Sequence, residues 1–140
     1  SAFFANTCQQ LLDKGINVLK QEGIGLVPLI EEGKIDTPEM MALLEQYLRP
    51  MVAKGMDYLV LGCTHYPYLT SLISEILPEN VRIMDSAQAV AKQTERILSQ
   101  NNLLAKEEEH VPSHLWLTNK NAEILQSFAP EGVRVLYEDF

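Results

Sequence analysis

The sequence contains only two cysteines, Cys8 and Cys63, and they do not stand at the spacing of a zinc-binding pair. This count argues against a disulfide-rich secreted scaffold, so we expect two free thiols in a cytoplasmic protein. The chain also lacks an apolar run of the ~18 residues that a membrane span needs, and we expect no signal peptide. No membrane partner is therefore predicted.

Basic residues are scarce as well. The chain has 11 Lys and Arg against 19 Asp and Glu, which gives a net charge of -8 and argues against a nucleic-acid partner. With 46% hydrophobic and 21% charged residues, the composition is that of an ordinary globular protein of 140 residues. The chain begins at Ser1, already inside a helical pattern, so we expect a fragment of a longer protein.

Helix and strand patterns alternate along the chain, which predicts an α/β fold with a mostly parallel sheet and helices on its faces. The polar stretch at 101–112, with its acidic run at 107–109, is predicted to be a solvated linker. Helices are expected over 3–20, 36–54, 68–77, from 85 onward and over 122–128, and strands over 24–30, 58–61, 81–84, 114–118 and 133–137.

The most informative stretch is DYLVLGCTHYP at 57–67. Its apolar run at 58–61 has the length of a buried strand and is too short for a helix. Gly62 then allows a sharp turn, and Pro67 suits the first turn of a following helix. The polar residues at 63–65 are therefore predicted to lie in a strand-to-helix turn, where open α/β sheets bind ligands.

Cys63 is the candidate reactive group of this turn. The N-terminal N–H groups and the dipole of the next helix favour a thiolate over a thiol. His65 is close enough in sequence to exchange a proton with the thiol, and Thr64 offers a hydroxyl to a ligand oxygen. Free amides at the turn would also hold a carboxylate or a phosphate. The residues alone leave open whether Cys63 is a nucleophile, a proton-transfer base or a small structural side chain.

Acidic and aromatic residues near this turn are weaker candidates for a functional role. Glu31 and Glu32 follow a predicted neighbouring strand, so one of them is expected to face the edge of the sheet where the turn lies. The alternative is that both are solvated loop residues. Asp85 suits a helix cap better than a catalytic acid. Tyr66 and Tyr68 are expected to pack the turn rather than to line a pocket.

A metal site is disfavoured. Zinc bound by Cys63 and His65 would need two more ligands, and His110 and His114 do not stand at a convincing spacing. Cys8 is expected on the first helix, in the core. We predict no metal.

Three segments resemble the cofactor-independent glutamate racemases. LGCTHYP at 61–67 resembles the second cysteine motif of that family, and His65 distinguishes it from superfamily relatives that share only Gly-Cys-Thr. LVPLIEEG at 26–33 is a second match, and MDSA at 84–87 followed by AVA at 89–91 is a third. The chain is therefore identified as a member of the aspartate/glutamate racemase superfamily.

The resemblance implies an isomerase that interconverts L- and D-glutamate without cofactor or metal and supplies D-glutamate for peptidoglycan. In the two-base mechanism of the family, one cysteine thiolate removes the α-proton and a second thiol returns a proton on the opposite face. Cys63 matches one base, Thr64 a substrate contact, and His65 a residue that contacts substrate and assists its cysteine. Glu31 resembles the acidic residue near that histidine, although Glu32 is adjacent.

The chain also departs from the family pattern. The Ala-Cys-Asn-Thr motif of the other cysteine and the Asp-Ser motif before it are absent, and Cys8 follows Asn and Thr in the wrong order. We therefore expect the C-terminal half of a racemase built from two three-layer α/β domains. Residues 1–84 would form most of the second domain, and residues 85–140 would complete the first. The fragment alone is predicted to be inactive, with the missing N-terminal half as its partner.

Two alternatives stay open. One is a superfamily racemase that acts on aspartate or a hydantoin, against which His65 argues. The other is a non-catalytic module that binds a small anion at the turn over 62–67, and an inert thiol would favour it. A homodimer is compatible with the sequence in every case.

Overall fold

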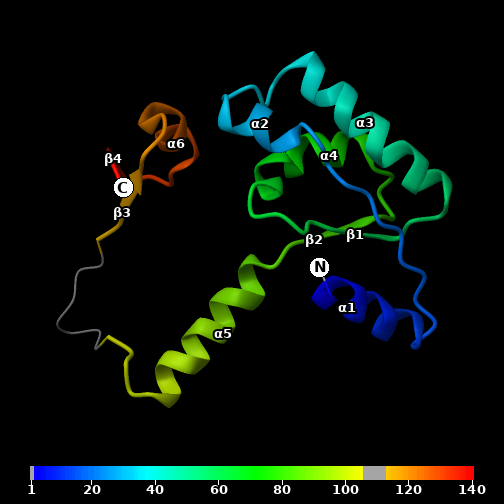
Figure 1. Ribbon diagram of the computed structural model, residues 1–140, viewed down its shortest axis with the longest axis horizontal. Helices are drawn as coiled ribbons and strands as arrows, with labels where there is room; N and C mark the ends of the chain where they lie inside the picture. Colours follow the sequence, from blue (N-terminus) through cyan, green and yellow to red (C-terminus); the bar gives the residue numbers. More distant parts are fainter. Residues whose placement is uncertain (1, 106–112) are drawn as a thin grey trace.

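The computed structural model describes residues 2–105 and 113–140, so the acidic run at 107–109 lies outside the described residues (Figure 1). Helices and strands alternate along most of the chain. In order they are α1 (Ala2–Leu12), α2 (Leu26–Glu31), α3 (Pro38–Ala53), β1 (Tyr58–Val60), the 3-10 helix η1 (Tyr66–Leu69), α4 (Thr70–Ile76), β2 (Arg82–Met84), α5 (Ala87–Gln100), β3 (Leu115–Thr118), α6 (Ala122–Phe128) and β4 (Arg134–Tyr137).

The strands pair in parallel, which confirms the predicted α/β class. β1 pairs with β2 with Leu59 opposite Ile83, and β3 pairs with β4 with Trp116 opposite Val135. The pairs form two separate two-stranded sheets. Each pair is joined by a helical crossover, α4 in the first case and α6 in the second, as parallel strands require.

The hydrophobic core lies where α2, α3 and α4 cover β1. α3 supplies Met40, Leu44 and Leu48 at four-residue steps, so that all three lie on one face of the helix. Leu59 of β1 and Ile73 of α4 are buried against the same cluster. This core holds both ends of the stretch that contains Cys63.

Residues 26–31 form the helix α2, where a strand over 24–30 was predicted. Gly25 precedes the helix with a φ of 87°, a left-handed conformation that turns the chain into it. Pro28 stands in the first turn, where its missing N–H costs nothing because those groups have no partner within the helix. Leu26, Leu29 and Ile30 are buried at helical spacing, so packing against the core outweighs the strand-like composition.

The end of the first helix also differs from the prediction, whereas α3 agrees with it. α1 ends at Leu12, well before the predicted end near residue 20, and Gly15 follows with a φ of 76°. α3 begins as predicted, since the Thr37 hydroxyl accepts the N–H of Met40 at 3.3 Å. It continues through Pro50 to Ala53.

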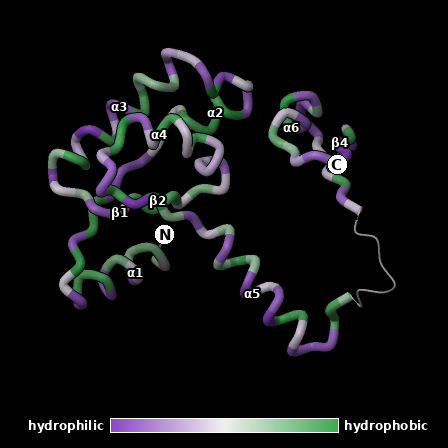
Figure 2. The backbone as a smooth tube through the Cα atoms, turned by 180° about the vertical axis from the view of Figure 1, so that it is seen from behind, coloured by the Kyte–Doolittle hydropathy of each residue, from purple (hydrophilic) through white to green (hydrophobic). Residues whose placement is uncertain are grey.

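Several apolar side chains stand on exposed surfaces. On β1 only Leu59 is buried, whereas Tyr58 and Val60 are 48% and 68% exposed, so the predicted fully buried strand is buried on one face only. None of the residues of α5, all of which the structure describes, is buried. Figure 2 shows hydrophobic and hydrophilic residues alternating along α5 as it extends from the body formed by α2–α4.

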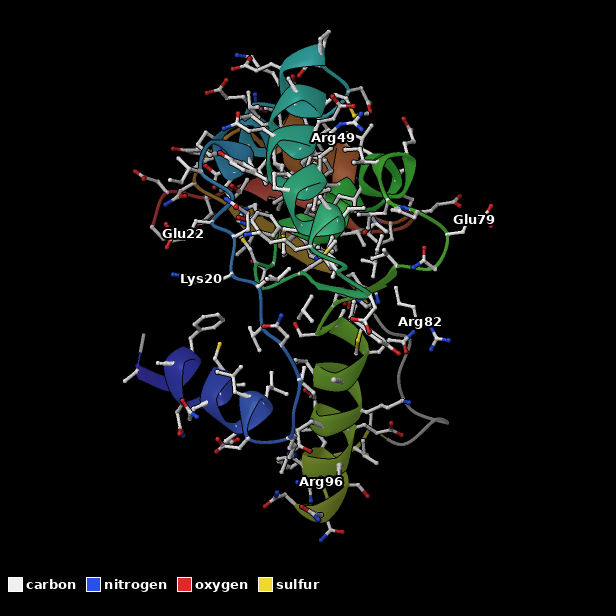
Figure 3. All side chains as sticks on the ribbon, turned by 90° about the vertical axis from the view of Figure 1, so that its right-hand side faces the viewer. Lys20, Glu22, Arg49, Glu79, Arg82 and Arg96 are labelled. Atoms are coloured by element: carbon white, nitrogen blue, oxygen red, sulfur yellow. The ribbon has the colours of Figure 1, made fainter. Side chains whose placement is uncertain are left out.

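Charged side chains lie on the outside of the molecule. Figure 3 shows Lys20 and Glu22 pointing outward from the segment that follows α1, and their 2.8 Å ion pair is exposed on both sides. The guanidinium of Arg82 lies 5.9 Å from the centre of the Tyr58 ring, on the exposed face of β1. Among the residues that the structure describes, no helix combines the length and the apolar character needed to cross a membrane.

Candidate functional site

The turn that carries Cys63 connects β1 to η1, as the sequence predicted. The N–H of Leu61 donates to the carbonyl of Met84 at 2.8 Å, so the chain stays bound to β2 up to the start of the turn. The N–H of Tyr66 donates to the carbonyl of Cys63 at 3.2 Å and closes it. Gly62 does not have a positive φ, and its conformation is therefore not the reason for a glycine there.

The helix after the turn begins with a 3-10 segment. Tyr66–Leu69 form η1 and Thr70–Ile76 continue as α4, slightly earlier than the predicted start at residue 68. Leu69 is completely buried, and Leu61 on the other side of the turn is buried too. The core thus holds both ends of a turn whose polar side chains reach the surface.

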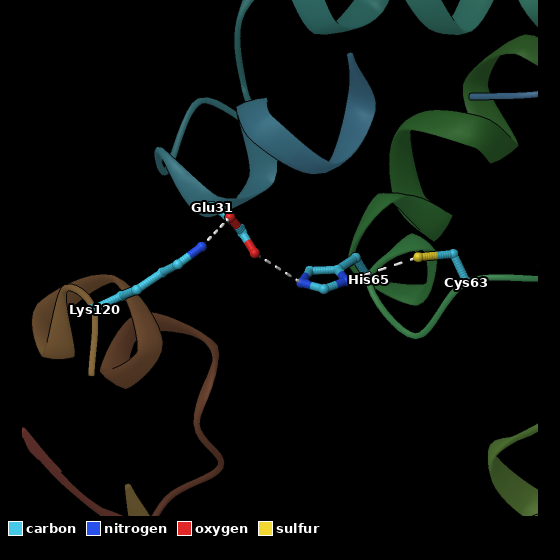
Figure 4. A network of polar contacts seen from close by, with 4 residues as sticks. All are labelled: Glu31, Cys63, His65 and Lys120. Atoms are coloured by element: carbon cyan, nitrogen blue, oxygen red, sulfur yellow. Dashed lines mark hydrogen bonds and ion pairs between the residues drawn. The ribbon is translucent and has the colours of Figure 1, made fainter. Parts of the chain in front are cut away.

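Cys63 and His65 lie side by side in this turn. The Sγ of Cys63 is 3.7 Å from Nδ1 of His65, within hydrogen-bonding reach for sulfur (Figure 4). Both residues are half-buried. The geometry lets the thiol proton pass to the imidazole, which would leave a thiolate beside an imidazolium.

Glu31 lies on the other side of the imidazole. Its Oε1 is 3.6 Å from Nε2 of His65, so the two ring nitrogens face the thiol and the carboxylate (Figure 4). Glu32 instead pairs with Lys34 at 2.7 Å. Of the two adjacent acids, the structure therefore brings Glu31 to the turn, and it does so because Glu31 is the last residue of α2.

Lys120 extends this chain of contacts, and the sequence analysis did not identify it. Its Nζ is 2.7 Å from Oε2 of Glu31, although 89 residues separate the two in the sequence. The hydrogen bond and the positive charge of Lys120 hold the pKa of Glu31 below its ordinary value of 4.5, and His65 adds a smaller effect in the same direction. No local pattern could have indicated a contact of this separation.

Tyr66 packs the turn, as predicted. Its hydroxyl donates to the carbonyl of Gly23 at 3.4 Å. Burial raises the pKa of Tyr66 above its ordinary value of 10.0, and the nearby Cys63 sulfur adds to the rise. A Cβ atom at Gly23 would lie 2.4 Å from the Tyr66 hydroxyl oxygen, so the absence of a side chain at Gly23 is what admits the phenol.

Tyr68 behaves differently from the prediction, because it lines a cavity. The cavity has a volume of about 220 Å³. It lies between α2 and η1 on one side and the segment formed by β3 and α6 on the other. Glu31, His65 and Lys120 contribute its charged and polar wall, and apolar side chains of α6 contribute another. The Tyr68 ring stands 4.4 Å from that of Phe128, measured between ring centres.

The remaining candidates lie elsewhere. Thr64 is exposed within the turn. The Asp85 carboxylate accepts the N–H of Ala87 at 2.8 Å and therefore caps α5, as predicted. Cys8 lies on α1, but it is only half-buried and stands outside the core cluster.

The described residues also include no group of three or more His, Cys, Asp and Glu side chains that could hold a metal ion. His110 lies outside the part of the chain that the structure describes, and His114 is exposed.

Comparison with known proteins identifies the family. A family model described as Asp/Glu/Hydantoin racemase matches residues 2–94. The chain belongs to this racemase family. This confirms the superfamily that the motifs at 26–33 and 61–67 indicated.

Curated relatives of this chain are glutamate racemases. The one from Pseudomonas putida strain F1 is 46% identical over 99 residues, which are 69% of this chain and 37% of the relative. The one from Pseudomonas putida strain GB-1 is 41% identical over 123 residues, which are 86% of this chain and 46% of the relative. The chain thus spans less than half the length of these relatives.

Solved structures agree with the sequence comparison. Glutamate racemase isoform RacE1 from Bacillus anthracis matches with a TM-score of 0.74 and 28% identity, over 96% of this chain and 51% of that chain. Glutamate racemase from Thermus thermophilus, solved with β-chloro-D-alanine, matches with a TM-score of 0.59 and 33% identity, over 80% of this chain and 44% of that chain. The α/β racemase fold is therefore confirmed.

Proposed function

We propose that this chain is the C-terminal half of a glutamate racemase and supplies one wall of its active site. Residues 1–84 would form most of the second domain, and residues 85–140 would complete the first. The shares of the relatives that the chain covers, 37%, 46% and 51%, support a chain of about half the enzyme. So do the exposed apolar residues of β1 and α5, which the other half of the enzyme would cover.

Cys63 would act as one of two acid/base thiols. Its thiolate takes the α-proton of one glutamate enantiomer, and a second thiol, supplied by the missing half, donates a proton to the opposite face of the resulting carbanion. One thiol gains a proton and the other loses one, so the reaction inverts the stereocentre with no net change in substrate composition. Because both faces need a proton donor, Cys63 alone cannot complete the reaction.

The observation that carries this proposal is the contact between Cys63 and His65, with Sγ and Nδ1 3.7 Å apart. The imidazole can hold the thiol proton while Glu31 faces the far side of the ring. Thr64, exposed in the same turn, would offer its hydroxyl and amide to the substrate. In this role His65 assists the thiol and also contacts the substrate.

The product would serve the cell wall. D-Glutamate is the enantiomer that bacteria build into peptidoglycan, and an enzyme that supplies it would work in the cytoplasm. The family model also covers aspartate and hydantoin racemases, so either remains the alternative substrate class. The curated relatives favour glutamate. Assays with glutamate, aspartate and a hydantoin, each followed by circular dichroism, separate the three.

The central test is Cys63→Ala in a longer chain that joins this segment to a half carrying the second cysteine. We expect racemisation of both glutamate enantiomers to be abolished, because the α-proton loses its acceptor on one face. Cys8→Ala is the matched control and should retain activity, since Cys8 lies on α1 away from the turn. Full activity of Cys63→Ala would refute the assignment. Turnover by the 140-residue chain alone would refute the claim that a second thiol is essential.

A further inference from the structure

The contact between Lys120 and Glu31 gives the carboxylate a fixed orientation. Oε2 of Glu31 binds Nζ of Lys120 at 2.7 Å, which leaves Oε1 to face Nε2 of His65 at 3.6 Å (Figure 4). We propose that Lys120 is a positioning residue that orients Glu31 against His65, behind the Cys63 thiol. This inference rests on the proposed role of Cys63 as an acid/base group.

The backbone of Lys120 is itself held in place. Its N–H donates to the hydroxyl of Thr118, the last residue of β3, at 3.1 Å. Asn121 caps α6, because its side-chain oxygen accepts the N–H groups of Glu123 at 2.9 Å and Ile124 at 3.3 Å. Lys120 therefore stands in a turn that is hydrogen-bonded on both sides, and its side chain starts from a defined position.

Apolar contacts bring this turn to Glu31. Phe128 of α6 packs against Tyr68 of η1 with ring centres 4.4 Å apart. Ile124 lies over Gly33, where an added Cβ would be in ordinary contact with it at 3.7 Å. The segment formed by β3, α6 and β4 thus docks beside α2 and η1, and Lys120 adds the polar contact at the edge of the same cavity.

Orientation rather than stability is the function that this ion pair suits. The side chain of Lys120 is 68% exposed, and exposed ion pairs add little to stability. The neighbouring pair of Lys34 and Glu32 has the same length, 2.7 Å, and similar exposure, but Glu32 does not face His65. Of these two ion pairs, the one formed by Lys120 is therefore the one that fixes a carboxylate next to the reactive turn.

The chemical consequence concerns the thiolate. When Cys63 gives its proton to His65, both ring nitrogens carry hydrogen, and the Nε2–H needs an acceptor. Glu31, 3.6 Å away, supplies the nearby negative charge that favours this imidazolium, and it does so only while its carboxylate is turned toward the ring. Glu31 faces two charged or titratable groups, Lys120 and His65. His65 in turn faces the Cys63 thiol, and Tyr66 lies near that thiol.

The test measures Cys63 reactivity in a Cys8→Ala background, in which Cys63 is the remaining thiol. We expect Lys120→Met to slow alkylation by iodoacetamide at neutral pH by about two- to five-fold, in line with an exposed ion pair, and to move the pH profile upward. Lys120→Arg should restore the rate because it keeps the charge and the donor. Lys34→Met is the matched control and should leave the rate unchanged.

A double-mutant cycle decides whether Lys120 acts through Glu31. In a Glu31→Gln background, Lys120→Met should have no further effect on the alkylation rate. The proposal is overturned if Lys120→Met changes nothing in the parent chain, or if it slows alkylation equally when Glu31 is absent. Because the readout is thiol reactivity, the cycle gives its answer whether or not the enzyme racemises glutamate. A failed racemisation assay would thus refute the proposed function, whereas the alkylation rates would still decide the role of Lys120.

Discussion

The glycines around the reactive turn show how little a residue type says without its surroundings. Gly62 stands directly before Cys63, but its backbone is not left-handed, and a Cβ there would meet no described atom within 4 Å. Gly23, which the sequence suggests only as the end of the first helix, is the position where a side chain would collide with Tyr66. The steric requirement thus lies 43 residues away from the phenol that it accommodates.

Gly23→Ala should therefore destabilise the protein, by roughly 1–3 kcal/mol as for other overpacked sites. The added methyl group would push the Tyr66 ring away and break its hydrogen bond to the carbonyl of Gly23. Urea unfolding measures the loss, and absorbance at 295 nm should show Tyr66 ionising at lower pH once it is displaced. Gly62→Ala is the matched control and should unfold like the parent. Equal stability of the two variants would contradict the structure at Gly23.

At the scale of elements, helix starts were the most predictable features. Thr37 and Asn121 both cap the helices that follow them, because a side-chain oxygen next to free backbone N–H groups is a local interaction. The strand over 58–60 and its turn were also predictable, since a short apolar run followed by polar residues has few alternatives. Such features depend on neighbours in the chain and are visible in the sequence.

α2 was not predictable in the same way. Its six residues are aliphatic apart from Pro28 and Glu31, and a run of that length fits a strand as well as a helix. Burial of Leu29 and Ile30 against α3 decides between them, and that contact is tertiary. The contact of Lys120 with Glu31 was hidden for the same reason, because 89 residues separate them.

The cap of α3 offers a test at this scale. Thr37→Ala removes the oxygen that accepts the N–H of Met40 and should lower the free energy of unfolding by about 1 kcal/mol. Thr37→Ser keeps the hydroxyl and should stay close to the parent protein. Thermal unfolding followed by circular dichroism compares the three. A Thr37→Ala variant as stable as the parent would mean that the cap contributes nothing to α3.

For the whole molecule, the notable feature is that docking of the C-terminal segment combines apolar and charged contacts. Tyr68 and Phe128 form the apolar part, and Glu31 with Lys120 forms the charged part. Each sheet has only two strands, which is marginal by itself, so these contacts matter for how β3 and β4 are held.

Acid should weaken the charged part of this docking by a small amount, because exposed ion pairs add little to stability. The pKa of Glu31 is lowered in the folded protein, mainly by the hydrogen bond from Lys120, so the charged carboxylate favours the docked state. That contribution is fully present above the ordinary glutamate value of 4.5 and is lost as the pH falls below it through the lowered value. Carbon-detected NMR titration of glutamate side chains should show that Glu31 takes up its proton below pH 4.5.

Lys120→Met serves as the comparison for this titration. It should bring the Glu31 titration back toward 4.5. If Glu31 titrates at the same pH with and without Lys120, the ion pair does not form in solution.

The separation of Glu31 and Lys120 along the chain also bears on biosynthesis. A ribosome completes α2 and the turn with Cys63 well before it reaches Lys120, the residue that orients the carboxylate. Until then Glu31 lacks the cation that, in the role proposed for Lys120, turns its carboxylate toward the imidazole. The polar contacts behind Cys63 would thus be completed only after synthesis has passed Lys120.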